Sequence, residues 1–203
     1  MSPSSARPRG PGKGEQPMIN GSTQKALAGI LTLAVLSAPL VAQGLDIAIK
    51  TVEPFPYLAI AHQGPYTAIG TVIGQVVGAM QAQGLFPQIR GPLVGVYYNS
   101  PGSVTPQQLS WEAGFIVTSQ TTCDPPLMKK VWEHRTVAAA LYVGPYDGAG
   151  AAVGKIMSWI GANGYVVTGP VLERYLDQSP SAVDPAKLRT EIWVPCIRPE
   201  RTK

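Results

Sequence analysis

Charged residues are scarce in this chain of 203 residues: Asp, Glu, Lys and Arg make up 14% of it, against 45% hydrophobic residues. A disordered chain would be far less apolar, so we expect a folded domain with its own core. The formal charge of +4 comes mostly from the first 42 residues, because residues 43–203 carry 12 basic and 11 acidic side chains. Nucleic-acid binding needs a concentrated basic face. The basic tail of Arg198, Arg201 and Lys203 is no such face, and the sequence argues against a nucleic-acid partner.

Cysteine and histidine are scarcer still, with two of each. His62 and His134 are far apart and lack metal-ligand spacing, and no Ser-His-Asp or Cys-His constellation is visible. The sequence therefore predicts no metal and no cofactor, and it disfavours conventional hydrolysis. Cys123 and Cys196 leave two alternatives open, one disulfide between them or two independent thiols.

Long apolar runs are also missing, since the longest, residues 26–41, covers about 16 residues where a membrane span needs about 20. Lys25 precedes this run, and small Ala42 follows it, which is the pattern of a secretory signal. We expect residues 1–42 to be a leader, with translation starting at Met1 or at Met18. Residues 43–203 would then be an exported domain, periplasmic or extracellular. The alternative is an uncleaved leader that anchors the domain, and no other membrane contact is expected.

An internal repeat organises the remaining chain. Gly64-Pro65-Tyr66 recurs as Gly144-Pro145-Tyr146, at an offset of 80 residues. Other residues match in the same order, with the offset falling to 78 or 79 further along: Glu53 and Glu133, Gly84 and Gly164, Gly91-Pro92 and Gly169-Pro170, Tyr97 and Tyr175, Glu112 and Glu191. We therefore expect one domain of two repeats, about 45–122 and about 123–199.

Each repeat contains one amphipathic helix, because apolar residues recur at positions i, i+3, i+4, i+7, i+8 and i+11. These positions are Ile69, Val72, Ile73, Val76, Val77 and Met80 in the first repeat, and Ala149, Ala152, Val153, Ile156, Met157 and Ile160 in the second. Gly84 and Gly164 follow the two stripes, where a glycine that ends a helix belongs.

Short apolar segments flank each helix and predict strands. They are residues 57–62, 93–98 and 111–118 in the first repeat, and 137–143, 171–176 and 191–197 in the second. Each repeat is then a βαββ unit. The predicted fold class is α+β, with two pseudo-symmetric repeats forming one curved antiparallel sheet and two main helices on one face. The other face would be concave along the pseudo-twofold axis and would suit a small ligand.

The order of these motifs resembles that of the GyrI-like domains, which also form the effector-binding half of AraC-type and MerR-type regulators. The resemblance rests on three segments: His62-Gln63-Gly64-Pro65-Tyr66, Gly91-Pro92 with Gly95-Val96-Tyr97-Tyr98, and Leu188-Arg189-Thr190-Glu191-Ile192-Trp193-Val194-Pro195. It covers about residues 45–199 and implies a stand-alone effector-binding domain with a SOUL-like fold.

The resemblance also implies a hydrophobic cleft between the repeats with a glutamate at its floor, which maps to Glu191. The repeat makes Glu112 its symmetry mate. Strand alternation puts Glu191 and Trp193 on one face, where a carboxylate beside an indole would suit a cationic or aromatic ligand. Further candidate walls of the site are Tyr98, Trp111, Tyr146 and Tyr175.

These observations favour a small-molecule-binding protein of the cell envelope or exterior. One alternative is a hydrolase of reactive strained-ring electrophiles, which some stand-alone family members resemble, with Glu191 as general base. A second alternative is a protein-interaction module. Haem binding, which the SOUL-like fold would suggest, has no convincing axial ligand here. The sequence leaves the ligand and the oligomeric state open.

Overall fold

The computed structural model describes residues 44–177 and 180–200. The predicted leader, residues 1–42, lies outside the described residues. Within the part of the chain that is described, no helix is both long enough and apolar enough to cross a membrane. All the elements below belong to the compact unit Ala42–Lys203.

One antiparallel sheet carries the fold. Its strands are β1 (Ile47–Thr51), β2 (Phe55–Gln63), β3 (Ile89–Tyr97), β4 (Ser110–Val117), β5 (Met128–Trp132), β6 (Thr136–Val143), β7 (Val166–Val167), β8 (Val171–Tyr175) and β9 (Arg189–Ile197). They lie in the order β1-β6-β9-β8-β3-β4-β2-β5, with β7 added to β9. The predicted α+β class is confirmed, and the six predicted strands correspond to β2, β3, β4, β6, β8 and β9. The central pair, β3 and β8, joins the two repeats.

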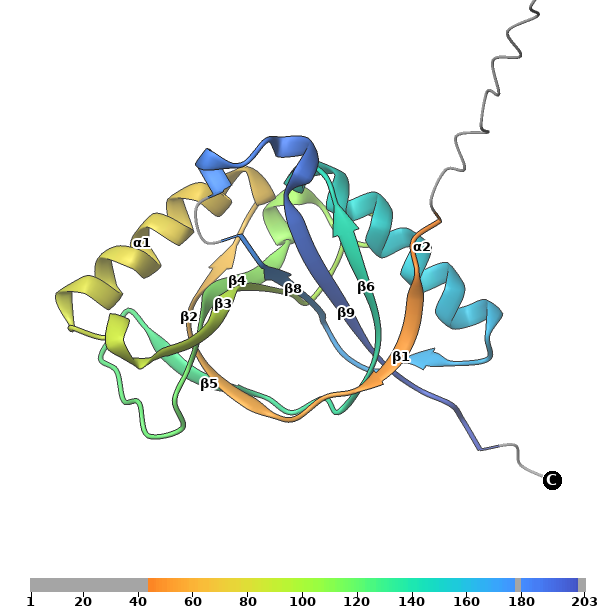
Figure 1. Ribbon diagram of the computed structural model, residues 1–203, viewed down its shortest axis with the longest axis horizontal. Helices are drawn as coiled ribbons and strands as arrows, with labels where there is room; N and C mark the ends of the chain where they lie inside the picture. The colour runs from red at the N-terminus through yellow and green to blue at the C-terminus, as the bar shows by residue number, and fades with distance from the viewer. Residues whose placement is uncertain (1–43, 178–179, 201–203) are drawn as a thin grey trace, which may run out of the picture. The chain divides into compact units, whose positions relative to one another are not determined.

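The two helices, α1 (Ile69–Ala82) and α2 (Ala149–Ala162), cover the same side of the sheet, each along one repeat (Figure 1). We call this side the helix face and the opposite side the inner face. The predicted apolar stripes supply the contacts of both helices, with Val76 and Ile156 fully buried. Gly84 and Gly164 have φ values of +66° and +74°, which favour glycine and confirm the predicted helix ends.

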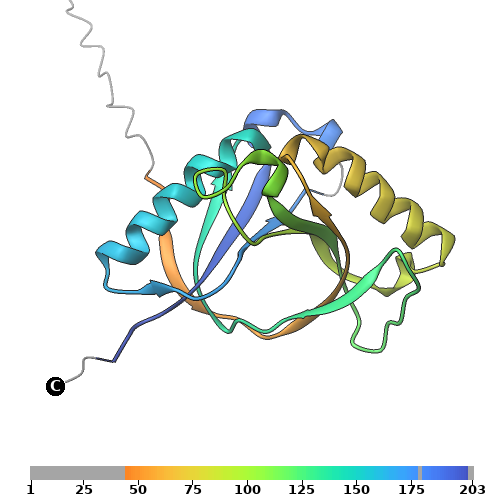
Figure 2. The same cartoon turned by 180° about the vertical axis from the view of Figure 1, so that it is seen from behind.

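β1 and β5 are absent from the prediction, and each pairs outside its own repeat. β1 pairs with β6 of the second repeat, and β5 pairs with β2 of the first. The connections that follow them meet where the Val52 N–H donates to the Arg135 carbonyl oxygen at 2.8 Å. Figure 2 shows the sheet curling so that these connections lie opposite the helices. The two repeats are thus interlocked by exchanged strands.

The inner face, which the sequence predicted to be a ligand-binding hollow, is largely filled by the protein's own side chains. Its buried cluster comprises Tyr57, Ala59, Val94, Val96, Ile116, Trp132, Val137, Ala139, Leu172 and Trp193, with Val52 and Phe55 packed against it. The Phe55 ring stacks on Trp132 with centroids 6.4 Å apart and meets Trp193 edge-on at 6.2 Å. Aromatic packing of this kind stabilises the curled sheet from within.

Both cysteines are free thiols, so no disulfide joins them in this structure. Cys196 is buried among the residues under α2, whereas Cys123 packs with those near the end of α1. The two side chains lie in the cores of different repeats, which separates them. Of the two alternatives left by the sequence, the structure has the independent thiols.

Candidate functional site

A groove of about 880 Å³ runs along α1 on the helix face. One wall is the α1 side formed by Ile69, Ile73 and Val77. The remaining lining residues come from the sheet and from the second repeat: Ile89, Arg90, Gly91, Pro92, Leu93, Phe115, Tyr146, Tyr175, Leu176 and Asp177. This volume matches that of sites for drug-sized molecules, and the lining is mainly apolar, as such sites are.

Glu173 lies on the helix face of β8, two residues before the lining residue Tyr175, and is only 8% exposed. The Tyr175 hydroxyl, which belongs to a lining residue, donates to the Glu173 carboxylate at 2.8 Å. The hydroxyls of Tyr175 and Tyr97 are hydrogen-bonded to each other at 2.7 Å. A buried carboxylate therefore stands one hydrogen bond behind the groove wall.

Tyr97 and Tyr175 each pack edge-on against a further tyrosine, in two pairs that the repeat relates. Tyr66 meets Tyr97 edge-on with ring centroids 5.2 Å apart, and Tyr146 meets Tyr175 at 5.1 Å. Tyr66 and Tyr146 come from the short 3-10 turns Tyr66–Ala68 and Tyr146–Gly148 that lead into the helices. We call Tyr66, Tyr97, Tyr146 and Tyr175 the tyrosine cluster.

Gly95 makes the centre of the sheet asymmetric. It is the repeat mate of Glu173 and also its direct neighbour across the β3–β8 pair. A Cβ atom at Gly95 would lie 2.8 Å from the Tyr97 hydroxyl and 3.1 Å from the Tyr175 hydroxyl. The missing side chain leaves room for both hydroxyls, so that a single carboxylate, not a pair, occupies the pseudo-twofold axis.

Burial controls the electrostatics of this site. It raises the pKa of Glu173, and the hydrogen bonds from Tyr175 and Tyr97 only partly offset the effect. Burial, together with the nearby negative charge of Glu173, also raises the pKa values of Tyr66, Tyr97 and Tyr175 above the usual 10. These three tyrosines are therefore neutral at physiological pH, and the pKa of Glu173 is shifted upward from the ordinary range of a glutamate.

Glu191, the predicted floor of the cleft, lies instead on the inner face, where two bases neutralise it. Lys50 Nζ lies 3.0 Å and Arg174 Nη1 2.5 Å from its carboxylate oxygens. Burial alone would raise the pKa of Glu191, but its hydrogen bonds and these positive charges lower it below the ordinary value. Trp193 is buried beside it, with the Arg174 guanidinium 4.6 Å from the indole centroid.

Glu112, the symmetry mate of Glu191, is fully buried on the inner face. It accepts hydrogen bonds from the hydroxyls of Tyr57 at 2.6 Å and Tyr98 at 3.0 Å, and it forms an ion pair with Lys130. Lys130 is the repeat mate of Lys50. Each glutamate is thus held by a lysine from the strand exchanged between the repeats, β5 for Glu112 and β1 for Glu191.

The seven predicted ligand-contacting residues are therefore dispersed. Only Tyr146 and Tyr175 line the groove. Trp111 is buried under α1 and donates its indole N–H to the Gly64 carbonyl at 2.9 Å. Ligand contact by Glu191, Glu112, Trp193, Tyr98 and Trp111 stays a prediction that the geometry does not favour.

Sequence reasoning missed Glu173, Tyr66 and Tyr97. One signal was available, because strand alternation places Glu173 on the same face as Tyr175, and that face of β8 is otherwise apolar. An acidic residue at such a position is expected to be solvated or functional, and this one is buried.

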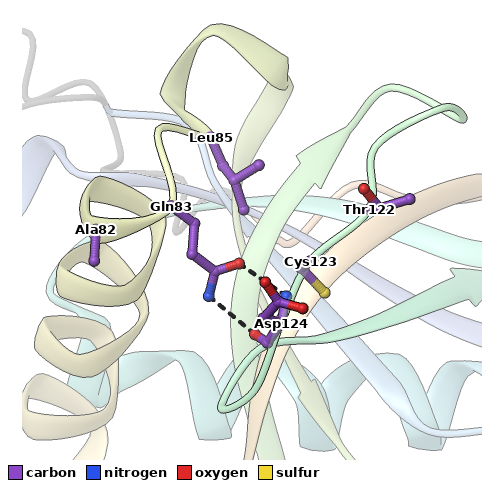
Figure 3. Close-up of a pocket in the computed structure, with 6 residues that line it drawn as sticks. All are labelled: Ala82, Gln83, Leu85, Thr122, Cys123 and Asp124. Atoms are coloured by element: carbon purple, nitrogen blue, oxygen red, sulfur yellow. Dashed lines mark hydrogen bonds between the residues drawn. The ribbon is translucent and has the colours of Figure 1, made fainter.

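A second, smaller cavity of about 400 Å³ lies between the end of α1 and residues 122–124 (Figure 3). The Gln83 side-chain amide exchanges two hydrogen bonds with the backbone of Asp124, each 2.9 Å long. Burial raises the pKa of the neighbouring Cys123 thiol, which keeps it protonated and unreactive at neutral pH. These groups tie the loop to the helix and do not assemble a reactive site.

Comparison with known proteins agrees with this architecture. In structure the chain is similar to the C-terminal domain of EcmrR, with a TM-score of 0.64 and 22% sequence identity; the match covers 76% of this chain and 99% of that one. It is also similar to EcmrR in its DNA complex, with a TM-score of 0.65 and 19% identity, and this match covers 76% of this chain and 58% of that one. It is similar to a hydrolase encoded by lin2189 from Listeria innocua, with a TM-score of 0.53 and 14% identity, over 75% of this chain and 92% of that one. It is similar to SAV2435 bound to tetraphenylphosphonium, with a TM-score of 0.54 and 12% identity, over 75% of this chain and 94% of that one.

These structural likenesses concern the fold, and the DNA complex extends well beyond the part that this chain matches. Among curated proteins, none matches the chain in sequence. The family model of the GyrI-like small molecule binding domain, however, matches residues 45–197, three quarters of the sequence. The chain therefore belongs to the GyrI-like small-molecule-binding family.

Proposed function

We propose that this chain binds a lipophilic cation in the groove, with Glu173 supplying the opposite charge and Tyr146 and Tyr175 supplying aromatic faces. Cations are attracted to the faces of aromatic rings, and more strongly where water is excluded. The apolar walls along α1 would take up the remainder of the ligand.

The observation that carries this proposal is the missing counter-charge of Glu173. Glu112 and Glu191 are each paired with basic side chains. In the residues 44–177 and 180–200, no ion pair involves Glu173, which accepts a hydrogen bond from the neutral hydroxyl of Tyr175. An ionised carboxylate buried without a cation is unfavourable, so a cationic ligand would supply what the fold omits.

Tetraphenylphosphonium is a suitable first probe, because it is a lipophilic cation and the similarly folded SAV2435 binds it. Isothermal titration calorimetry of the chain with this cation tests the proposal. Saturable binding that raises the melting temperature is expected, since a ligand of the folded state stabilises it. No detectable binding of tetraphenylphosphonium or of alkylammonium ions would refute the proposed function.

Binding of the cation should weaken as the solution becomes acidic. The carboxylate form of Glu173 attracts the cation, and its pKa is raised, so protonation begins above the ordinary range for glutamate. Below that pKa the affinity should fall about tenfold per pH unit. Calorimetry from about pH 8 down to about pH 4 measures this dependence. An affinity that stays constant over this range would show that Glu173 does not face the ligand.

Turnover is the second candidate function, and the raised pKa of Glu173 favours it. A carboxylate beside a hydroxyl and an apolar groove could act as general base on a water molecule. Incubation with a strained-ring electrophile such as a lipophilic epoxide, followed by mass spectrometry, distinguishes the two functions. If the wild-type protein consumes the epoxide and the Glu173→Gln variant does not, the protein is an enzyme. If the epoxide stays unchanged with the wild-type protein, binding is the remaining function.

A further inference from the structure

The groove has one long axis, and its two ends differ in charge; both features follow from the elements that line it. Its helical wall comes from α1 alone, and the second repeat contributes only Tyr146, Tyr175, Leu176 and Asp177. The first turn of α1 packs near Tyr97, and its later turns pack near Ile89. The groove therefore runs outward from the tyrosine cluster along α1, away from the pseudo-twofold axis.

The spacing of the lining residues on α1 measures this axis. Ile69 and Val77 lie eight residues apart on α1, which corresponds to about 12 Å of helix. On β3 the lining residues are Leu93 and Ile89, between which the strand is irregular. The groove is therefore about 12 Å long beside α1, and its walls are mainly apolar.

Charge distinguishes the two ends of the groove. Tyr146 and Tyr175 line the central end, and Glu173 lies one hydrogen bond behind Tyr175. Asp177 also lines the groove, but it is ion-paired with Arg189. Arg90 lines the groove beside Ile89 at the outer end, where its guanidinium donates to the carbonyl oxygens of Pro87 and Ile89 at 2.8 Å. A positive charge there repels a second cation, so a ligand with cationic groups at both ends fits this site poorly.

From this geometry we propose, on the basis of the function proposed above, that the groove selects elongated amphiphiles with one cationic head and one unbranched alkyl chain. The head lies against Tyr146 and Tyr175 near Glu173, and the chain lies along Ile69, Ile73 and Val77. An extended covalent chain advances about 1.2 Å per bond, so about ten carbons reach the outer end of the groove.

The test is a series of alkyltrimethylammonium ions, from butyl to hexadecyl, titrated calorimetrically below their micelle concentrations. Affinity should rise about fourfold per methylene, the equivalent of about 0.8 kcal/mol. The rise should stop near ten carbons, where further methylenes remain in water. A bis-trimethylammonium decane should bind more weakly than decyltrimethylammonium.

Matched variants test where the alkyl chain of the ligand lies in the groove. Val77→Trp narrows the outer groove and should move the plateau to shorter chains, whereas Gln75→Trp, on the exposed side of α1, should leave it unchanged. An affinity independent of chain length, a rise that continues through hexadecyl, or an unmoved plateau in Val77→Trp would overturn this inference. Tetraphenylphosphonium binding would still support the proposed function in each of these cases, so the two failures are distinguishable.

Discussion

Replacing Glu173 with glutamine is expected to weaken tetraphenylphosphonium binding roughly 30- to 100-fold. Unit charges about 6 Å apart attract each other by about 2 to 3 kcal/mol at an effective dielectric constant near 20, and a tenfold change in affinity corresponds to about 1.4 kcal/mol. Glutamine keeps the shape of the side chain and can still accept the Tyr175 hydroxyl. The loss would therefore report the charge itself, measured by calorimetry at neutral pH.

The same substitution should leave stability unchanged or raise it. A carboxyl whose pKa is raised in the folded state stabilises the fold below its unfolded pKa, and this contribution is lost as the pH rises through the folded pKa. Ionisation of Glu173 therefore destabilises the folded state, and glutamine cannot ionise. Thermal unfolding of Glu173→Gln beside wild type measures this effect and shows that the fold is intact.

Glu191→Gln is the matched control, because Glu191 is already neutralised by Lys50 and Arg174. Its affinity for the cation should stay within about twofold of the wild-type value, a difference of less than about 0.5 kcal/mol. The opposite result, with affinity lost in Glu191→Gln and kept in Glu173→Gln, would return the site to the inner face and to the residues that the sequence alone indicated.

Substituting Lys130 with methionine is expected to destabilise the protein by about 2 to 3 kcal/mol. The Glu112 side chain is 0% exposed, and that of Lys130 is 33% exposed. Removing one partner of a buried pair leaves an uncompensated charge, which costs about 3 to 5 kcal/mol. Partial solvation of the lysine reduces that figure. The corresponding fall in melting temperature is roughly 5 to 10 °C for a chain of this size.

Lys50→Met, at the repeat-related position, provides the comparison. The Lys50 side chain is 50% exposed, and Glu191 keeps Arg174 as a second partner, so a loss of less than about 1 kcal/mol is expected. Chemical unfolding of both variants measures the difference. Adding Glu112→Gln to Lys130→Met should restore most of the lost stability, because the unpaired charge is then gone. Equal losses in the two lysine variants would contradict the role assigned to burial.

The elements of this fold were largely predictable, because their signals are local. The spacing from Ile69 to Met80 marks α1, and Gly84 follows where a left-handed residue ends the helix. The offset of 80 transfers both features to α2 and Gly164. β1 and β5 were not predictable in the same way, since Lys50 and Lys130 lie in short segments whose pairing partners belong to the other repeat.

The candidate site was predictable only in part. Tyr146 and Tyr175 were expected near a ligand and do line the groove, whereas the buried carboxylate that is hydrogen-bonded to Tyr175 is Glu173 and not the predicted Glu191. Alternation shows that Glu191 and Trp193 share a face of β9, but it does not show which face the helices cover or which basic side chains lie opposite.

The sequence by itself determined the duplication, the two helices and the six strands around them, because hydrophobic periodicity and glycine positions act within a few residues of chain. Tertiary structure alone decided the rest. Exchanged strands bring Lys50 and Lys130 to two of the glutamates and neutralise them, while the central pairing of β3 with β8 buries Glu173 among tyrosines, away from any such lysine. Charge compensation depends on contacts between residues far apart in the chain, and only the folded sheet brings those residues together.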